Sequence, residues 1–393
     1  MSKVVVVSYA RTAISTFGGS LKSIPAADLA VTAIKGALEK KSINPELVDE
    51  VILGCVGQFG EDAFISRVAA INAGIPASKN AYTVNRLCGS GLQAINNGIQ
   101  QILTKQSDIV VAGGVENMDR YPYLDFSTRF GNKMGHVQLE DGLTTALSDP
   151  FNKYAMGITA ENVADMYSIT REEQDLFAYE SQMKAKHAIV SGYFDSSIVP
   201  VEVPQRKGDP IIFDKDEHPR FNTTLESLAK LRPAFKKDGT VTAASSSGIN
   251  SGAAVLVLMS EEKAQELSLE PLAYLTDHAT AGVEPEIMGV APAYAIEKLL
   301  NKNNYSIEDI DLVELNEAFA AQVLGVLKII DIPKDRLNVN GGAIALGHPI
   351  GASGAIVTIK LIEELRRTGK NRGISSLCIG GGQGIATLVQ IKL

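Results

Sequence analysis

One strand–helix unit occurs twice in this chain of 393 residues, and this internal repeat constrains the fold more than any other feature. Three pairs of matching positions recur in the same order at offsets of 262, 263 and 267 residues: Asp49 and Asp311, Ser90 and Ser353, and Gly113 and Gly380. Such similar offsets imply two copies of one unit. Residues 119–250, between the copies, have no counterpart and are rich in polar residues and turn signals.

Each copy alternates strand-like apolar runs with segments of helical periodicity. Strands are predicted at 3–8, 50–56, 108–113, 311–315, 374–379 and 385–392. Helices are predicted at 25–40, 91–105, 291–300, 317–329 and 351–366, with one further helix within 156–190. This alternation favours mostly parallel sheets covered by helices. Two such halves facing each other give an α/β protein with α/β/α/β/α layers, in which strand ends from both halves meet at one site.

The repeat also predicts the domain organisation. We expect an N-terminal half formed by residues 1–118 with 251–269, a loop domain at 119–250, and a C-terminal half at 270–393. Two to three domains are usual for a chain of this length.

Cys88 lies where a strand-like run gives way to a helix whose apolar residues recur from Leu92 to Leu103. A thiol at a helix N-terminus lies beside unpaired backbone N–H groups and the positive end of the helix dipole, and both stabilise a thiolate. We therefore expect a reactive cysteine, flanked by glycines that let a substrate approach the backbone. The alternative is a small buried cysteine that packs the strand–helix corner.

Three further residues that could take part in catalysis lie at the ends of strand-like runs in the second copy. Pro349 suits the first turn of a helix, which would place His348 at the positive end of that helix and keep its ring neutral. Cys378 precedes a glycine turn, and Asn316 precedes another helix. Each has an alternative interpretation: His348 as a capping histidine, Cys378 as a core cysteine, and Asn316 as a helix N-cap.

Together these segments resemble the thiolase family over essentially the whole chain. The resemblance is specific because many short motifs occur in the family's order: Ala10–Ala13, Phe17–Gly19, Asn85–Gly91, Gly113–Met118, Met156–Asn162, Leu231–Phe235, Asn316–Phe319, Asn338–Gly354 and Cys378–Gly384. It implies a thiolase-like five-layered α/β fold and a reversible reaction. Two acetyl-CoA molecules condense to acetoacetyl-CoA and CoA, or a longer 3-ketoacyl-CoA is cleaved by CoA.

The resemblance also implies roles for the four residues. Cys88 would be the nucleophile that carries the acetyl group, and Cys378 the acid/base. His348 would help to deprotonate Cys88 and, with a water bound by Asn316, hold the thioester oxygen as the enolate develops. The N–H groups of Cys88 and Gly380 would form a second oxyanion hole.

A polyanionic ligand such as coenzyme A needs a local basic region, because the chain as a whole has a net charge of −8. Residues 206–238 hold eight basic and six acidic residues, although such a run is more often a solvated loop. By resemblance, Arg220 and Ser227 lie near the nucleotide end of coenzyme A. The pantetheine tunnel is bordered by Leu231, Phe235, Ala243, Ser247, Ala318 and Phe319, and the acyl pocket is lined by Met156 and Met288.

Two features bear on substrate and assembly. Ala155 stands where short-chain biosynthetic thiolases often have histidine, so the preferred acyl length stays open between acetoacetyl-CoA and longer 3-ketoacyl-CoA. Residues 129–135 resemble the loop that pairs dimers into tetramers in the biosynthetic enzymes, and we expect a homo-oligomer.

Composition and charge exclude several other classes. The acidic net charge argues against nucleic acid as a partner, and no apolar run is long enough to span a membrane. Three cysteines and no targeting pattern at the N-terminus favour the cytoplasm. The histidines outside the motifs lack metal-ligand spacing, so we expect no metal and no other cofactor.

The two alternatives to a thiolase are a different condensing enzyme of the same fold and a non-catalytic thiolase-like protein. Ketoacyl-acyl-carrier-protein synthases pair their cysteine with two histidines or with histidine and asparagine, and Cys378 argues against them. A non-catalytic thiolase-like scaffold would have lost one or more of the four site residues, and all four are present.

Overall fold

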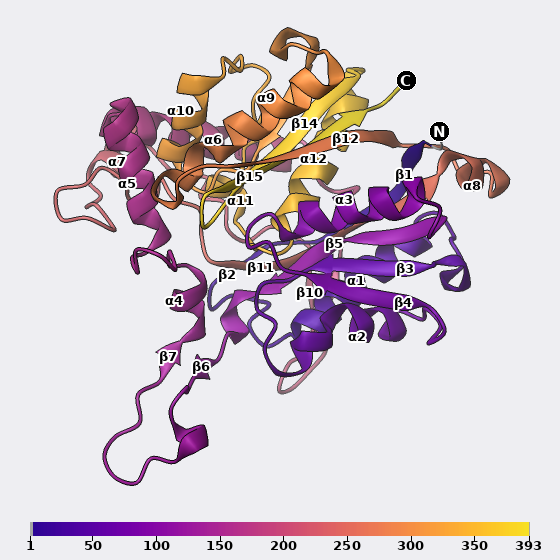
Figure 1. Ribbon diagram of the computed structural model, residues 1–393, viewed down its shortest axis with the longest axis horizontal. Coiled ribbons are helices and arrows are strands. Elements are labelled where there is room, and N and C mark those ends of the chain that lie inside the picture. The colour runs from indigo at the N-terminus through magenta and orange to yellow at the C-terminus, as the bar shows by residue number, and fades with distance from the viewer. Residues whose placement is uncertain (1–2, 393) are drawn as a thin grey trace.

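Residues 3–392, as described by a computed structural model, fold into two matching halves whose strands form one continuous sheet (Figure 1). The first half contributes β1 (Val4–Thr12), β3 (Glu50–Gly54), β4 (Asn80–Val84), β5 (Ile109–Asn117) and β11 (Asn250–Ser260). The second half contributes β12 (Ala273–Gly282), β13 (Leu312–Leu315), β14 (Arg372–Ile379) and β15 (Gln383–Gln390). The halves join where β1 pairs with β12 over only two residue pairs.

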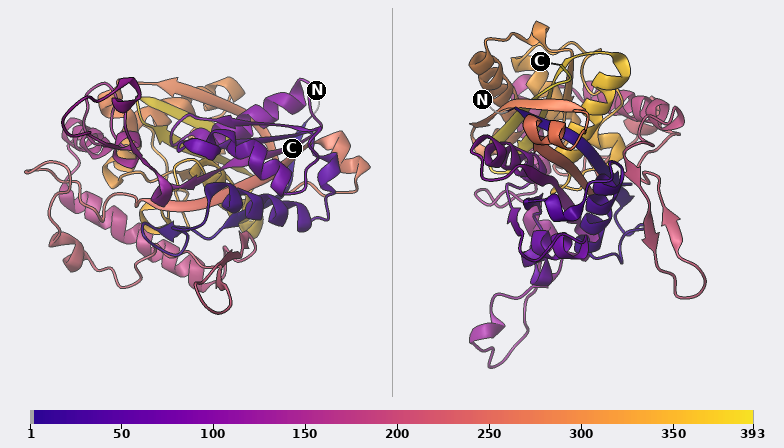
Figure 2. Two further views of the ribbon diagram at one scale, coloured as in Figure 1. Left: turned by 90° about the horizontal axis from the view of Figure 1, so that it is seen from below. Right: turned by 90° about the vertical axis from the view of Figure 1, so that its right-hand side faces the viewer.

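The helices form three layers around the two halves of the sheet (Figures 1 and 2). In the central layer, α3 (Ser90–Leu103) and α12 (Ser353–Thr368) contact each other and strands of both halves, and they share one buried apolar cluster. Helices α1 (Ala26–Glu39) and α2 (Ile65–Asn72) cover the outer face of the first half. Helices α9 (Ala291–Asn303) and α10 (Ala320–Ile329) cover that of the second. The predicted five-layered fold is confirmed.

The two halves repeat the same order of elements. The strand β4 has a short counterpart at Leu337, which bridges Val313 of β13 in parallel, as β4 pairs with β3. The sheet is mixed, however, so the prediction of mostly parallel strands is wrong. β11, β12 and β15 pair antiparallel with their neighbours. A parallel pair needs a crossover of a dozen or more residues, whereas β14 and β15 are joined by a turn of three glycines.

Most of the residues between the halves form helices and hairpins outside the layers. Two helices, α5 (Met156–Tyr167) and α6 (Arg171–Val190), occupy the stretch where a single helix was predicted. Ser168 ends α5 in the left-handed conformation at φ 52°, and Thr170 begins α6 with a capping box. Short elements between the halves are β8 (Ile198–Val199), α4 (Gly142–Ala146) and α7 (Leu225–Ala229). Short elements within the halves are β2 (Ser15–Thr16), α8 (Glu261–Glu266) and α11 (Ala343–Leu346).

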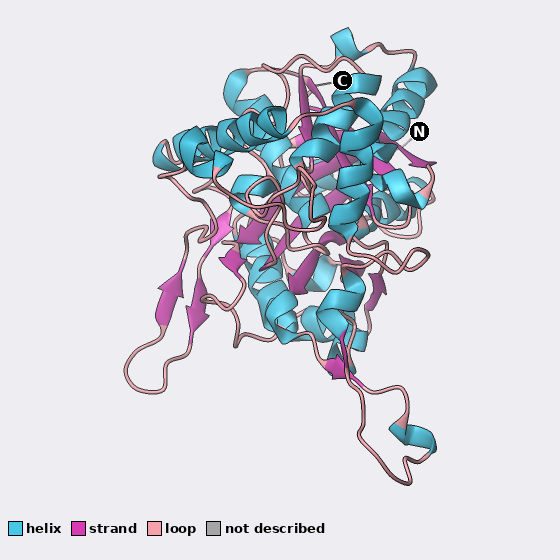
Figure 3. Cartoon of the chain, turned by 90° about the vertical axis from the view of Figure 1, so that its left-hand side faces the viewer, coloured by secondary structure: helices cyan, strands magenta, loops and turns pink. Residues whose placement is uncertain are grey.

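Two hairpins project from the body of the molecule (Figure 3). One is formed by β9 (Val201–Val203) and β10 (Ile211–Phe213), and the other is an arm between β6 (Tyr123–Leu124) and β7 (Glu140–Asp141). The arm exposes large apolar side chains, with Phe130 90% and Met134 92% exposed. None of the helices within residues 3–392 is long and apolar enough to cross a bilayer.

Candidate active site

Cys88 lies in a tight turn between β4 and α3. The preceding residue, Leu87, has a φ of 43°, an uncommon conformation for a residue with a side chain. Local hydrogen bonds hold this turn: Asn85 Oδ1 accepts from Leu87 N–H at 3.0 Å, and Ser90 Oγ accepts from Arg86 N–H at 2.8 Å. Because α3 begins at Ser90 rather than at the cysteine, Cys88 precedes the helix instead of forming its first turn.

The protonation state of Cys88 differs from the prediction. Burial raises the pKa of the Cys88 thiol to about 11, so the resting group is a thiol and the expected stabilised thiolate is wrong. The N–H groups of Gly380 and of Cys88 itself donate hydrogen bonds to the sulfur and lower its pKa, but loss of solvent outweighs them. These are the two N–H groups that the sequence analysis assigned to an oxyanion hole.

Cys378 is fully buried at the end of β14, and its loop packs against that of Cys88. A Cβ atom built on Gly380 would lie 3.2 Å from Leu87 Cδ1, and one built on Gly89 would lie 2.5 Å from Ile379 Cδ1. Burial, and then the nearby charge of a Cys88 thiolate, raise the pKa of the Cys378 thiol. The structure therefore brings the two cysteines of different halves into one electrostatically coupled site.

The glycine turn after Cys378 is required by its backbone. Gly381 and Gly382 have φ values of 84° and 86°, in the region that favours glycine. A side chain on Gly382 would also meet the carbonyl oxygen of Val283 at 2.2 Å. The turn thus holds the Gly380 N–H group against the Cys88 sulfur.

His348 and Asn316 lie side by side in the buried part of the second half. Asn316 Nδ2 lies 3.4 Å from His348 Nε2, and His348 Nδ1 lies 2.6 Å from Ser353 Oγ. Ser353 Oγ donates to the carbonyl oxygen of Pro349, so Nδ1–H donates to Ser353 and Nε2 is left as the acceptor. This assignment leaves Nε2 as the nitrogen that can take a proton.

The neutral ring of His348 was predicted, but its cause differs. Burial lowers the pKa of His348 to about 4, whereas the sequence pattern had indicated a helix N-terminus as the cause. Helix α12 begins only at Ser353, five residues later. Asn316 is likewise not an N-cap, because α10 begins at Ala320 with Phe319 as its cap.

Asn250 fixes the main chain of His348 and was missed by the sequence analysis. Its Oδ1 accepts from His348 N–H at 2.9 Å, and its Nδ2 lies 3.2 Å from His218 Nδ1. A Cβ on Gly347 would lie 2.6 Å from Asn250 Cγ, so only glycine fits there. The motif that contains Gly347 is visible in the sequence, but its partner 97 residues upstream is not.

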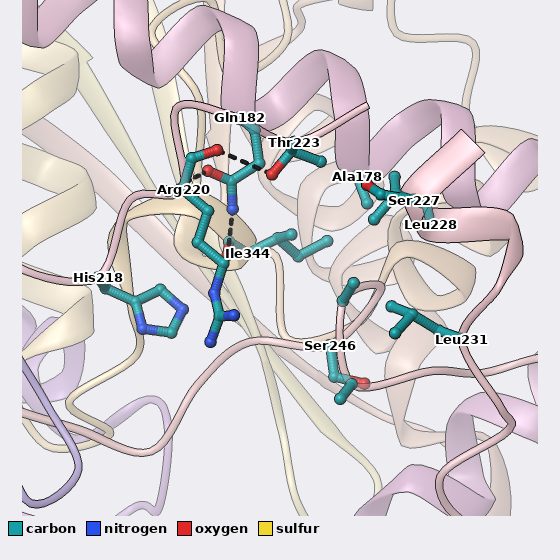
Figure 4. Close-up of a pocket in the computed structure, with 12 residues that line it drawn as sticks. Ala178, Gln182, His218, Arg220, Thr223, Ser227, Leu228, Leu231, Ser246 and Ile344 are labelled. Atoms are coloured by element: carbon teal, nitrogen blue, oxygen red, sulfur yellow. Dashed lines mark hydrogen bonds between the residues drawn. The ribbon is translucent and has the colours of Figure 1, made fainter. Parts of the chain in front are cut away.

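A cavity of about 270 Å³ lies between the inserted residues and the second half (Figure 4). Four of the residues predicted to bind coenzyme A line it: Arg220, Ser227, Leu231 and Ala243. Ser246 lines it in place of the predicted Ser247, whose N–H donates to Ala318 O at 2.9 Å. His218 also lines it, two residues before Arg220, and burial lowers its pKa to about 4.

The other predicted ligand-binding residues form an apolar cluster around Cys378 instead of lining this cavity. Phe319, Ala318, Met288, Met156 and Phe235 pack together there, and the rings of Phe235 and Phe319 lie 5.9 Å apart. Met156 also approaches the glycine turn, since a Cβ on Gly380 would lie 2.6 Å from Met156 Cε.

Residues 243–250 connect the cavity to the cysteine site. Ala243 and Ser246 line the cavity, Ser246 bridges Phe319, and Ile249 bridges His348. A ligand seated against this segment would therefore lie along a continuous wall that ends at the catalytic histidine candidate. Within residues 3–392, no group of three His, Cys, Asp or Glu side chains is placed to hold a metal ion; that the reaction needs no cofactor stays a prediction.

The fold and the site define an α/β enzyme of two repeated halves, with two electrostatically coupled cysteines and a buried, neutral histidine on a neighbouring loop. Comparisons with known proteins agree: the profile "Thiolase, N-terminal domain" matches residues 4–262, and "Thiolase, C-terminal domain" matches 269–391. The chain therefore belongs to the thiolase family, and it is an acyltransferase.

Individual relatives match over their full lengths. A probable acetyl-CoA acyltransferase of Staphylococcus aureus (strain COL) is 52% identical over 390 residues, which are 99% of either chain. The crystal structure of the Bacillus anthracis acetyl-CoA acetyltransferase has a TM-score of 0.98 at 48% identity, covering 100% of this chain and 99% of that one. Human mitochondrial 3-ketoacyl-CoA thiolase in complex with CoA has a TM-score of 0.96 at 44% identity, covering 100% and 98%.

Proposed function

We propose that this thiolase interconverts two acetyl-CoA molecules with acetoacetyl-CoA and CoA, through an acetyl group carried on Cys88. The observation that carries the proposal is the pairing of Cys88 with Cys378, each from a different half. We assign proton transfer to His348, because its contact with Ser353 leaves Nε2 without a proton. The relatives' names and the CoA complex support coenzyme A thioesters as substrates.

The resting protonation states suit the cleavage direction. Cys88, a thiol, attacks the 3-keto carbon of acetoacetyl-CoA while His348 Nε2 takes its proton. With the pKa of Cys88 raised to about 11 and that of His348 lowered to about 4, no ion pair forms before substrate binds. Proton transfer must accompany attack, as the Cys88 and Gly380 N–H groups stabilise the oxygen charge that develops.

Collapse of this adduct breaks the bond between the α- and 3-carbons and leaves acetyl-Cys88 and an enolate. The Cys378 thiol donates its proton to the enolate carbon, giving acetyl-CoA, and His348 then returns its proton to the Cys378 thiolate. The sulfur of CoA next attacks acetyl-Cys88, and the proton of CoA passes through His348 Nε2 to the released Cys88. Both cysteines are thiols again, and condensation is the same sequence in reverse.

Around these cysteines, we propose that Asn316 orders a water that, with His348, holds the thioester oxygen of the enolate. Arg220 and Ser227 bind the nucleotide end of coenzyme A, and the cavity of Figure 4 leads the pantetheine arm along residues 243–250. This assigns coenzyme A binding and oligomerisation to the inserted residues 119–250. The proposal needs no metal or other cofactor.

A second candidate is a 3-ketoacyl-CoA thiolase of fatty acid degradation that accepts longer chains. The exposed Ala155 favours it, because this small residue immediately precedes Met156, whose side chain approaches the glycine turn. The human 3-ketoacyl-CoA thiolase at 44% identity also supports it.

For its assembly, we propose a homotetramer in the cytoplasm, built through the arm that contains residues 129–135. The exposed Phe130 and Met134 support this, because large apolar side chains on a projecting hairpin are typical of protein contacts. The low cysteine content supports a reducing compartment.

Thiolysis rates with 3-ketoacyl-CoAs of four, six, eight and more carbons test the proposed reaction. CoA-dependent cleavage of acetoacetyl-CoA supports it, and a rate that rises with chain length favours the second candidate. Absence of CoA-dependent cleavage at every length, from a folded protein, would contradict both.

A further inference from the structure

Glu116 is a buried carboxylate that touches both halves of the site, and no step of the proposed reaction uses it. The residue is 1% exposed and is the second-last residue of β5. Its Oε2 accepts from the N–H groups of Val56 at 3.1 Å and Gly351 at 2.9 Å. Its Oε1 accepts from Gly57 N–H at 3.0 Å and from the Tyr121 hydroxyl at 2.8 Å.

The donors from the first half belong to a loop that lies directly behind Cys88. Cys55 N–H donates to the carbonyl oxygen of Val84, which ends the strand before the Cys88 turn. A Cβ on Gly54 would lie 2.4 Å from the carbonyl carbon of Ser90, so this loop also touches the chain after the turn. By holding residues 55–57, Glu116 supports the Cys88 turn on both sides.

The donor from the second half lies on the loop that carries His348. Gly351 follows His348 by three residues, and a Cβ built on it would lie 2.7 Å from Glu116 Oε2. The intervening Ile350 packs in one apolar cluster with Val56 and Cys88. The His348 loop and the Cys88 turn therefore meet at one carboxylate.

We propose that Glu116 is a positioning residue, whose carboxylate holds the Cys88 turn and the His348 loop at the separation that proton transfer between them requires. This inference rests on the proposed function, since it assumes that His348 takes the Cys88 proton. A displacement of about 1 Å between such groups can lower a rate by about 100-fold.

The substitution Glu116→Gln tests the carboxylate at nearly constant volume. The amide –NH₂ group replaces one oxygen, and in either orientation it faces a backbone N–H donor, of Gly351 and Val56 or of Gly57. We expect kcat to fall by about 10- to 100-fold. KM for the coenzyme A thioester should stay within about twofold, because the cavity residues do not contact Glu116. Acetylation by acetyl-CoA and condensation should fall together, because both use His348.

Glu364→Gln is the matched control. Glu364 is also buried and accepts from Asn340 Nδ2 at 2.8 Å and from Arg367, but it lies at the far end of α12 from His348. It should keep kcat near the wild-type value. Gly351→Ala tests the same contact from the other loop and should lower kcat with unchanged KM.

Thermal melting and circular dichroism identify the variants that fold. Wild-type kcat in folded Glu116→Gln or in folded Gly351→Ala overturns the proposal. An equal fall in kcat in Glu364→Gln also overturns it, because the effect would then follow from changing any buried carboxylate. Turnover by the wild-type enzyme in the same assay tests the proposed function separately.

Discussion

Nδ1 of His348 lies 2.6 Å from Oγ of Ser353, and this hydroxyl in turn donates a hydrogen bond to the carbonyl oxygen of Pro349. The chain of contacts leaves Nε2 without a proton, beside Asn316. It therefore selects the tautomer on which the proposed role of His348 as proton acceptor depends.

Ser353→Ala removes the partner of Nδ1 while keeping a residue that suits the start of α12. We expect kcat to fall by about 10-fold or more, because the ring loses its orientation and tautomer preference. Steady-state kinetics of acetoacetyl-CoA thiolysis measure this loss. Thr358→Ala, which removes another buried hydroxyl from the same helix, is the control. Equal activity of Ser353→Ala and wild type would show that Ser353 does not set the tautomer.

The raised pKa of Cys88 predicts how alkylation depends on pH. Below a pKa of about 11 the thiolate fraction grows about tenfold with each pH unit, so the rate of inactivation by iodoacetamide should keep rising from pH 7 to pH 10. Mass spectrometry of the labelled peptide assigns the rate to Cys88. A plateau reached below pH 8 would mean that the free enzyme holds a thiolate, as a helix N-terminus would favour.

Substitution of Cys378 should impair one half-reaction, whereas substitution of His348 should impair both. Cys378→Ala should still take an acetyl group from acetyl-CoA, yet lose condensation by about 100-fold or more, because only the enolate step needs Cys378, which removes the α-proton of the second acetyl-CoA. His348→Ala should impair both steps. Rapid-quench measurement of acetyl transfer beside steady-state condensation distinguishes them, and full condensation by Cys378→Ala would reject the division of roles.

Ala155 predicts acceptance of chains longer than four carbons. Ala155→His should lower thiolysis of a six-carbon 3-ketoacyl-CoA relative to acetoacetyl-CoA, because a larger side chain would directly precede Met156, which contacts the glycine turn. The ratio of kcat/KM values for the two substrates measures the effect. If the wild type already refuses six carbons, other residues close the pocket.

Sequence predicted the layers and the loops of this site because both depend on local patterns. The repeat placed Cys88 in one half and His348 and Cys378 in the other, and apolar periodicity located α3 and α12 to within two residues at each end. Strand direction was predicted wrongly, since β11 pairs antiparallel with strands more than 130 residues away in the sequence, and such pairing leaves no local pattern.

The electrostatics of the site also depended on tertiary packing. The pKa of Cys88 is raised because two halves of the chain cover it, whereas the local helix signal indicated the opposite shift. The partners of His348 show the same limit. Ser353 lies five residues away and could be considered from the sequence, but Asn250 is brought to His348 only by the fold.

The most direct test of the central claim is to locate the acetyl group. Wild-type enzyme mixed with labelled acetyl-CoA, quenched in acid and digested, should carry the label on the peptide that contains Cys88, and unlabelled CoA added before the quench should remove it. Cys88→Ser should carry no label at that peptide. Label at the wild-type level in Cys88→Ser, or on the Cys378 peptide of the wild type, would contradict the account.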